Sequence, residues 1–531
     1  MELINKTLGQ CLHEQALKFS SKIAIDLNDF RCTYSELDNI SDRVAVKLQK
    51  LNIVKGTHVG IWGVNSAKWV ILFYALEKLG AVPVLINTCY REIEVRDILN
   101  HFDTEVLFYG EGYKDLVYKD ILDNIKDKLL CVHDMFSIES FIEYDFSPLD
   151  PEHKHMLSDL MSNVASSDPA CMIFTSGTTS LPKGVVLTHF NVINNSLAMI
   201  KSMHWSADDK MCISVPLFHC FGITAGIVSC MLSGMSFYLL AYFKTNLVWN
   251  AIENCDCTIL NGVPSMFLAL VKKEKYKDRN GNSLKSGIIA GSAFKPSEYI
   301  DICRRFPNMH LQPSYGQTET SPCISIADWD SDIEFKSMAG GRVIENVRVR
   351  IADPSTDRPL EAGATGEIQV KGYNVMHGYY NMPEANKLVF TDDGWLKCGD
   401  LGYLDKDNFL YVTGRIKEMI IRAGENISPF EIEEAILGLD SIDQVKVVGV
   451  PAQVRQEEIA ACIVLKTGRH ISAVQIKDYL CKRLAHYKVP EYYIFLDNLP
   501  LNASGKIDLK EIKNIALLKA QEARVMNHNE I

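Results

Sequence analysis

The chain has 531 residues, of which 47% are hydrophobic and 23% are charged, and its formal net charge is −11 at pH 7. This length predicts a globular protein of at least two domains, and the negative charge argues against general binding to nucleic acid or to an anionic membrane. Fifteen cysteines without a C-x-x-C pair indicate reduced thiols rather than a disulfide framework or a zinc site. Because residues 1–6 also lack the features of a secretory signal, we expect a cytoplasmic protein.

Residues 1 to about 165 alternate between helix and strand patterns. Apolar residues recur at helical spacing within 37–51 and again within 69–76, whereas 58–62 and 81–86 are apolar runs of strand length. This alternation predicts a mostly parallel sheet covered by helices. We identify no residue in this part that carries chemistry.

A loop rich in hydroxyl groups and glycine follows the apolar run 170–174 and precedes another at 185–187. Its small polar residues are Thr175, Ser176, Gly177, Thr178, Thr179 and Ser180. Their hydroxyls and backbone N–H groups can surround phosphate oxygens, and Lys183 adds a mobile positive charge. The loop is not a Walker A motif, because Pro182 and Gly184 flank the lysine. We expect a polyphosphate site between two strands, with an ordinary surface turn as the alternative.

The segment 211–243 contains no Lys, Arg, Asp or Glu, so its length alone would allow it to cross a bilayer. Proline and glycine divide it into pieces typical of a strand, a turn, a buried helix and a second strand, and no basic flank orients it, so we expect no membrane span. Within it, His219 follows Pro-Leu-Phe and precedes a glycine-rich helix start. A lone histidine among apolar residues is usually a core group, and a place in a binding pocket is the alternative.

Two further loops carry candidate nucleotide-binding residues, the first of them after the apolar pair Ile288-Ile289. The first contains Gly291, Ser292 and Ala293, and the second contains Tyr315, Gly316, Gln317, Thr318 and Glu319. An aromatic ring suits adenine stacking, a hydroxyl suits a phosphate, and a carboxylate suits Mg²⁺, which prefers oxygen ligands and shares them with phosphates. Taken alone, either loop could be an ordinary turn.

The C-terminal part has its own pattern. Asp400 lies between glycines and could accept hydrogen bonds from ribose hydroxyls, with a solvated turn as the alternative. Ser428-Pro-Phe-Glu431 predicts a capping box at a helix start. The strand patterns 445–450, 459–464 and 492–495 and a helix pattern near 471–484 then predict a small α+β domain. Lys506 lies on a polar loop, where most exposed lysines have no function.

Six of these segments occur in the order found in the adenylate-forming superfamily, which the chain resembles. The superfamily comprises acyl-CoA synthetases, adenylation domains of peptide synthetases and firefly luciferase. Segments 315–322, 371–380 and 414–427 are most similar to medium-chain fatty acyl-CoA ligases. The resemblance implies an α/β fold with a large N-terminal domain of helix-covered β-sheets, residues 1–414, and a small mobile α+β domain, residues 415–531. It implies that a carboxylate attacks the α-phosphate of ATP to give acyl-AMP and pyrophosphate, and that CoA then displaces AMP.

The resemblance also implies roles for single residues. The catalytic residues would be Lys506, Lys183, His219, Thr318 and Glu319, with Mg²⁺ held by Glu319 and Thr179. The acyl pocket would be lined by His219, Phe221, Gly222, Gly226, Ser314 and Tyr315. The nucleotide and CoA would be contacted by the residues of the three loops above and by Asp400, Arg415, Lys417, Gly424 and Lys506. Asp400 and Arg415 would bind the ribose, Lys417 would lie at the hinge, and Gly424 would let the CoA arm pass.

Three positions depart from the superfamily pattern, namely Ser180, Ser314 and Cys398. The expected partners are a carboxylic acid, ATP and CoA, with no nucleic acid. An aryl or other acid, a carrier protein as acceptor, an oxidative luciferase-like activity and a nucleotide-binding module without catalysis stay open as alternatives. The absence of a carrier segment between Lys506 and Ile531 favours CoA. The oligomeric state is open, and a homodimer is one alternative.

Overall fold

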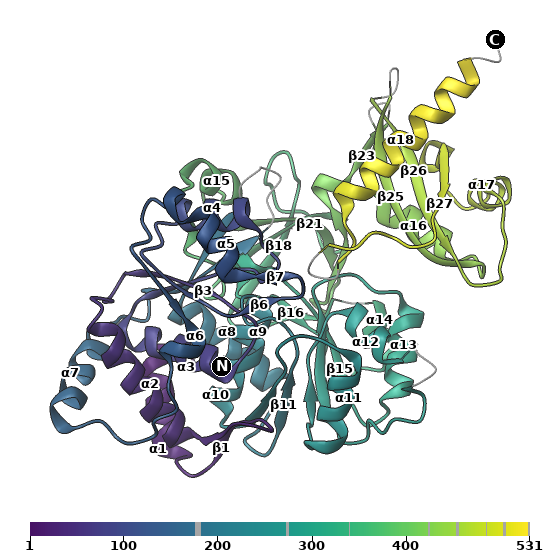
Figure 1. The fold of residues 1–531 in the computed structure, drawn as a ribbon. Helices are drawn as coiled ribbons and strands as arrows, with labels where there is room; N and C mark the ends of the chain where they lie inside the picture. The colour runs from purple at the N-terminus through teal and green to yellow at the C-terminus, as the bar shows by residue number, and fades with distance from the viewer. Residues whose placement is uncertain are drawn as a thin grey trace. The chain divides into compact units, whose positions relative to one another are not determined.

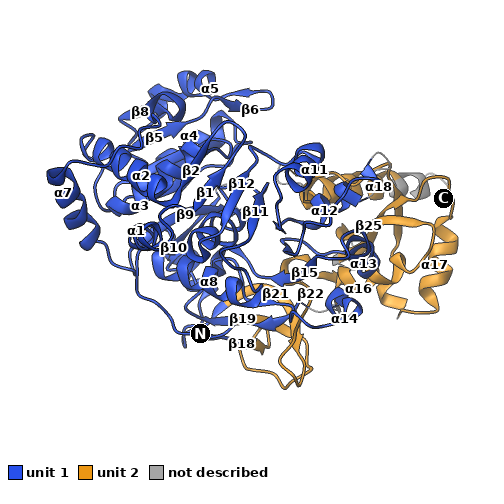
Figure 2. Ribbon diagram, turned by 90° about the horizontal axis from the view of Figure 1, so that it is seen from below, with its two compact units in different colours: residues 1–349, 370–396 blue, residues 350–369, 397–531 orange. Residues whose placement is uncertain are grey.

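The computed structural model describes residues 1–175, 182–271, 276–338, 340–422, 425–452, 456–484, 486–502 and 506–528. The chain forms two compact units, which Figure 2 distinguishes by colour. The first unit consists of residues 1–349 and 370–396, and the second of residues 350–369 and 397–531. This division assigns 350–369 and 397–414 to the second unit, whereas the sequence analysis places both segments in the large domain. The functional boundary at Arg415 to Lys417 concerns a hinge and stays a prediction.

A seven-stranded sheet forms one layer of the first unit. Its order is β20 (Gly378–Tyr379), β10 (Lys183–Thr188), β9 (Pro169–Thr175), β4 (Val82–Leu85), β3 (His58–Trp62), β5 (Val106–Tyr109) and β8 (Asp134–Ser137). The pairs from β9 to β8 are parallel, while β10 is antiparallel to both β9 and β20. The predicted parallel sheet is therefore confirmed.

A nine-stranded sheet forms the second layer of this unit. Its order is β17 (Arg342–Val343), β16 (Ser325–Ile326), β15 (His310–Tyr315), β14 (Ser286–Ala290), β13 (Ile259–Leu260), β11 (Lys210–Ile213), β12 (Ser236–Leu239), β1 (Ile23–Asp26) and β2 (Arg31–Thr33). The strands from β15 to β1 are parallel. Their carboxyl ends therefore meet at one edge of the sheet, where α/β proteins commonly bind ligands.

Helices cover both sheets, as Figure 1 shows. The main ones are α1 (Leu8–Lys18), α2 (Tyr34–Gln49), α3 (Ala67–Leu79), α4 (Glu92–His101), α5 (Tyr118–Ile125), α7 (Pro151–Ser162), α8 (His189–Ser202), α11 (Thr245–Asn254), α12 (Pro264–Val271) and α13 (Pro296–Arg305). Thr33 begins α2 through a capping box with Glu36. The apolar faces of α4 and α5 pack with Trp62 and Phe102 of the seven-stranded sheet region. Those of α11 to α13 pack on the nine-stranded sheet.

The uncharged segment 211–243 forms strand β11, the short helices α9 (Cys220–Gly222), η2 (Ile223–Val228) and α10 (Ser229–Ser233), and strand β12. Among the described residues, none of the helices has both the length and the apolar character of a bilayer span. The division of this segment into strand, turn, buried helix and strand is confirmed.

The second unit contains most of a four-stranded sheet and the whole of a five-stranded sheet. The first has the order β18 (Val347–Ala352), β19 (Gly366–Gly372), β21 (Leu396–Leu404) and β22 (Leu410–Arg415). The second has the order β24 (Glu425–Ile427), β23 (Ile420–Arg422), β26 (Gln456–Leu465) and β25 (Ile442–Ala452), with β27 (Tyr492–Phe495) paired to β26. The small α+β domain is thus confirmed.

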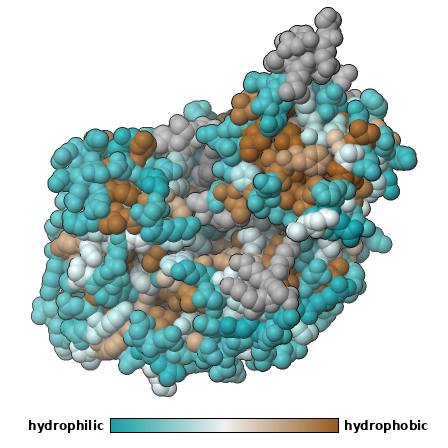
Figure 3. Space-filling view, turned by 45° about the vertical axis from the view of Figure 1, so that its right-hand side comes forward, coloured by the Kyte–Doolittle hydropathy of each residue, from teal (hydrophilic) through white to brown (hydrophobic). Residues whose placement is uncertain are grey.

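Helices cover both faces of the five-stranded sheet. Ile432 of α16 (Pro429–Leu437) and Ile476 of α17 (Ala473–Cys481) belong to one apolar cluster. Ile512, Ala516 and Ala520 of α18 (Leu509–His528), spaced four residues apart, belong to the other. In Figure 3, hydrophilic side chains cover most of the visible face, with an apolar area on the second unit.

One local prediction is wrong. Helix α16 begins at Pro429, but the Ser428 side chain makes no capping hydrogen bond. Its Oγ donates instead to the carbonyl oxygen of Thr413, at 3.2 Å. The hydroxyl therefore joins the helix start to strand β22, a partner that is distant in the sequence.

Candidate active site

The ends of the phosphate loop lie on paired strands. Thr175 is the last residue of β9, Lys183 is the first of β10, and the two are partners in the antiparallel register. Residues 176–181, and with them the predicted contacts of Ser176, Gly177, Thr178 and Thr179, lie outside the described residues. The Nζ of Lys183 lies 4.4 Å from the centre of the Tyr379 ring.

The segment that follows β15 is tightly built. A Cβ at Gly316 would lie 1.8 Å from the carbonyl oxygen of Pro322, so only glycine fits there. The short helix η4 (Thr318–Thr320) follows, and its Glu319 is buried, at 9% exposed. Glu319 Oε1 accepts a hydrogen bond from the Tyr379 hydroxyl at 2.8 Å. The segment therefore turns back on itself and holds a carboxylate beside the residue that contacts Lys183.

Two asparagines that the sequence analysis missed hold this segment. The Asn195 amide makes two hydrogen bonds with the backbone of Cys323, at 2.9 and 3.0 Å. Asn374 Nδ2 donates to the same Cys323 carbonyl at 3.0 Å. Both side chains are fully buried. The sequence carried no clear signal for this role, because Asn195 stands between Asn194 and Ser196, and only the structure shows that both amides are buried and therefore need partners.

His219 forms the N-cap of α9, where its Nδ1 accepts a hydrogen bond from the backbone N–H of Phe221 at 3.2 Å. The next residue, Cys220, places its Sγ 3.7 Å from Thr318 Oγ1. The structure therefore brings the His219 segment and the Thr318–Glu319 segment together. A Cβ at Gly222 would lie 2.2 Å from the Pro216 carbonyl oxygen, so this glycine permits a close backbone approach.

Five further predicted residues lie at the carboxyl ends of two parallel strands of the nine-stranded sheet. Gly291, Ser292 and Ala293 follow β14, and Ser314 and Tyr315 end β15. Gly291 has φ +90°, which favours glycine. The Ser314 hydroxyl donates to the carbonyl oxygen of Ser325 at 2.9 Å. The contacts of these residues with ligands stay predictions.

A narrow cavity, lined without charged side chains and too small to admit a water molecule, lies at the carboxyl end of β13. Its lining residues are Phe243, Leu260, Asn261, Gly262, Met266, Phe267 and Leu270. The Asn261 amide donates to the Ala225 carbonyl at 3.0 Å and accepts from the Ile288 N–H at 2.9 Å. These bonds place the cavity next to η2, which contains Gly226. The sequence analysis missed this cavity, because its lining comes from an ordinary apolar helix and strand.

The second unit contains the predicted ribose-binding pair. Asp400 and Arg415 are partners in the β21–β22 register, with Arg415 Nε 2.9 Å from Asp400 Oδ1. Asp400 is 3% exposed and lies in a strand, so the alternative of a solvated turn is wrong. Arg415 is half-exposed, with 62% of its side-chain surface accessible.

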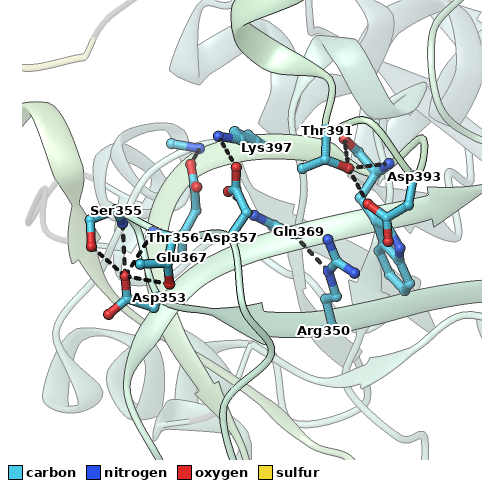
Figure 4. Close-up of polar contacts among 12 residues, drawn as sticks. Arg350, Asp353, Ser355, Thr356, Asp357, Glu367, Gln369, Thr391, Asp393 and Lys397 are labelled. Atoms are coloured by element: carbon cyan, nitrogen blue, oxygen red, sulfur yellow. Dashed lines mark hydrogen bonds and ion pairs between the residues drawn. The ribbon is translucent and has the colours of Figure 1, made fainter.

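Other polar contacts of the four-stranded sheet and its loops are drawn in Figure 4. The buried Gln369 accepts from Arg350 Nε at 2.7 Å and donates to Asp357 Oδ1 at 2.8 Å. Glu367 accepts from the Gly399 N–H at 3.2 Å, next to Asp400. Burial raises the pKa of Glu367. Gly399, the residue before Asp400, is therefore held in place by the buried carboxyl group of Glu367.

The other predicted residues of the second unit lie on short segments. Lys417 lies in η5 (Ile416–Glu418), and Gly424 lies outside the described residues. The Lys506 N–H donates to Asn502 Oδ1 at 3.0 Å, and the Asn502 N–H donates to the Lys506 carbonyl at 2.7 Å. Near Lys417, Lys446 lies 3.1 Å from both Glu418 and Glu433. Burial lowers the pKa of Lys446, but these carboxylates outweigh burial and raise it overall.

Known families and relatives match most of the chain. Residues 12–380 match the family model described as AMP-binding enzyme, and residues 431–506 match the AMP-binding enzyme C-terminal domain. YngI of Bacillus subtilis (strain 168), which is named as an acyl-CoA synthetase, is 34% identical over 539 residues, covering 96% of this chain and 97% of YngI. The mitochondrial medium-chain acyl-CoA ligase ACSF2 of Homo sapiens is 30% identical over 534 residues, covering 95% of this chain and 86% of ACSF2.

One solved structure shows a similar fold with a reaction intermediate. It is o-succinylbenzoate CoA synthetase (MenE) from Bacillus subtilis in complex with the acyl-adenylate intermediate OSB-AMP. The sequences are 28% identical, the TM-score is 0.79, and the match covers 96% of this chain and 98% of that one.

Proposed function

Because the chain belongs to the AMP-binding enzyme family and is an acyl-CoA synthetase that uses ATP and CoA, we propose that its acid is an uncharged, medium-chain fatty acid. The observation that carries the proposal is the segment 211–243, which contains no Lys, Arg, Asp or Glu, together with the uncharged lining of the narrow cavity at the end of β13. A carboxylate or an amine at the far end of the substrate would be buried there without a partner, which costs several kcal/mol. The name of the relative ACSF2 also specifies a medium-chain acid.

In the proposed adenylation step, the substrate carboxylate attacks the α-phosphate of ATP. Attack of one anion on another is slow unless positive groups are already placed where charge develops. Lys183 at the phosphate loop and Lys506 on the C-terminal loop are the proposed groups. Tyr315 would stack on adenine, and Asp400 would accept hydrogen bonds from the ribose while Arg415 holds its carboxylate in place. The reaction needs no side-chain nucleophile.

The residues present fit a magnesium ion bound together with ATP. Within the described residues, no group of three or more His, Cys, Asp or Glu side chains could hold a metal ion alone. Mg²⁺ is commonly held by one or two carboxylates, by substrate phosphates and by water, and Glu319 offers a buried carboxylate oriented by a hydrogen bond. When bound, Mg²⁺ would neutralise phosphate charge. Glu319 would hold it, with Thr179 as a second predicted ligand.

The acceptor, the acid and the location of the protein stay predictions. A carrier protein remains the alternative acceptor, which competition between CoA and a carrier protein would test. An aryl acid remains the alternative substrate. The cytoplasmic location also stays a prediction, because the relative ACSF2 is named as a mitochondrial protein.

The test is a screen of fatty acids from C2 to C16, small aryl acids, dicarboxylates and amino acids, with AMP release measured in the presence of CoA. We expect the highest kcat/KM at an intermediate chain length. A dicarboxylate or an amino acid as the best substrate would overturn the proposal, and an aryl acid would establish the alternative.

A further inference from the structure

Tyr379 contacts two charged residues that the proposed function assigns to ATP and to its metal ion. Lys183 Nζ lies 4.4 Å from the centre of the ring, and the hydroxyl donates to Glu319 Oε1 at 2.8 Å. Tyr379 is 6% exposed. The neutral Tyr379 side chain therefore contacts a cation with its ring and an anion with its hydroxyl group.

The strand register produces the first contact. Tyr379 of β20 is the partner of Val185 in β10, and Lys183 lies two residues before Val185. Residues two apart in a strand point to the same face, and such a diagonal neighbour is within reach of an aromatic ring. The pairing of β10 with β20 therefore brings the ring to the lysine at the end of the phosphate loop.

The second contact, from the Tyr379 hydroxyl to Glu319, joins β20 of the seven-stranded sheet to a segment that follows a strand of the nine-stranded sheet. Glu319 follows β15, and its backbone carbonyl accepts from the Met376 N–H at 2.9 Å. The Asn386 side chain fixes Tyr379 in turn, because it accepts from the Tyr379 N–H at 2.8 Å and donates to the Tyr379 carbonyl at 3.0 Å. Both ends of the hydroxyl contact are therefore held by backbone hydrogen bonds.

We propose that Tyr379 is a positioning residue that holds Lys183 and Glu319 in place for ATP and its metal ion. The ring face attracts the ammonium group of Lys183 through a cation–π contact. The hydroxyl orients the Glu319 carboxylate, as outer-shell partners of metal ligands do. The inference rests on the proposed roles of Lys183 and Glu319.

The test measures Mn²⁺ binding, as a substitute for Mg²⁺, to the full chain in the presence of a non-hydrolysable ATP analogue, by electron paramagnetic resonance. Tyr379→Phe keeps the ring under Lys183 and removes only the hydroxyl. We expect it to weaken Mn²⁺ binding about 10- to 100-fold. Tyr379→Leu also removes the ring, and we expect it to weaken binding of the analogue itself, measured at saturating Mn²⁺.

Tyr380→Phe is the matched control, because the Tyr380 hydroxyl donates to Asp103 at 2.8 Å rather than to Glu319. It should bind Mn²⁺ as the wild type does. Glu319→Gln separates the two proposals. If it weakens Mn²⁺ binding and Tyr379→Phe does not, Tyr379 is a core residue only, even if Tm falls, and the inference is overturned. If Glu319→Gln has no effect, the proposed metal role of Glu319 fails, and the inference fails with it.

Discussion

The two units hold their charged residues in different ways. In the first unit, the neutral Tyr379 lies between Lys183 and Glu319, contacting each of them. In the second unit, Asp400 and Arg415 form a direct ion pair across neighbouring strands. The proposed phosphate and metal ligands of the first unit are therefore positioned by a neutral side chain, whereas the proposed ribose ligand of the second unit is positioned by a charged one.

The units also differ in what their residues should control. The cavity in the first unit should determine which acid is used, while Lys506 and Gly424 of the second unit should determine which half-reaction proceeds. Variants of the second unit should therefore alter one step, and variants of the cavity should alter substrate preference. The first and third of the four predictions below test this distinction, and the other two test the polar contacts of the second unit.

The largest effect is expected from Lys506→Ala and Gly424→Leu. Lys506→Ala removes a donor needed while acyl-AMP forms, so adenylation from acid and ATP should fall about 10²- to 10³-fold. Conversion of synthetic acyl-AMP plus CoA should continue. Gly424→Leu should do the reverse, because its side chain would obstruct the CoA arm. Equal losses in both assays for both variants would contradict a division of the half-reactions between these residues.

A smaller effect is expected from Asp400→Asn, which removes the charge of the ribose-binding pair. Hydrogen bonds to a charged group contribute about 1.5–3 kcal/mol, so KM for ATP should rise about tenfold or more. The measurement is steady-state kinetics at saturating acid and CoA. Asp328→Asn, which breaks the partly exposed pair with Arg342, is the control and should leave this KM unchanged. An unchanged KM in Asp400→Asn would contradict ribose binding by this pair.

Met266→Ala should enlarge the cavity of the first unit. A buried methylene group is worth about 0.8 kcal/mol, so kcat/KM should rise about fourfold for each additional methylene that the enlarged cavity accepts. The chain-length optimum should therefore move to longer acids without a change in the ratio of the two half-reactions. Met266→Leu keeps the volume and should keep the optimum. If Met266→Ala left the optimum in place, the cavity would not be the end of the acyl pocket.

The smallest effect concerns stability. Burial raises the pKa of Glu367 above its ordinary value, so its favourable contribution is complete below the unfolded pKa and is lost as pH rises through the folded pKa. Glu367→Gln keeps an oxygen for the Gly399 N–H and should increase the free energy of unfolding at pH 7–8 by about 1 kcal/mol or less. This increase in the free energy of unfolding should vanish below about pH 4. Denaturant titrations at several pH values can measure it. The exposed Glu361→Gln should show no such trend, and a loss of stability in Glu367→Gln at pH 8 would contradict the account.

The order of local elements was readable from the sequence alone. The runs 58–62, 170–174 and 185–187 became strands because apolar runs between turn residues have few other solutions. The strands and helices of the small α+β domain followed from similar patterns, whereas its boundary at Arg415 to Lys417 stays a prediction. The chemistry of Lys183, Glu319, Asp400 and Lys506 could also be proposed from the residue types and their order.

Only the tertiary structure decided which of these residues meet. The contact of Tyr379 with Lys183 depends on the pairing of β10 with β20, and the contact with Glu319 joins two sheets. The Ser428 hydroxyl bonds to Thr413 rather than closing the predicted capping box. The lining of the cavity combines a strand end with a helix. Such contacts depend on register and packing between distant parts of the chain, and a local pattern of residues carries no information about either.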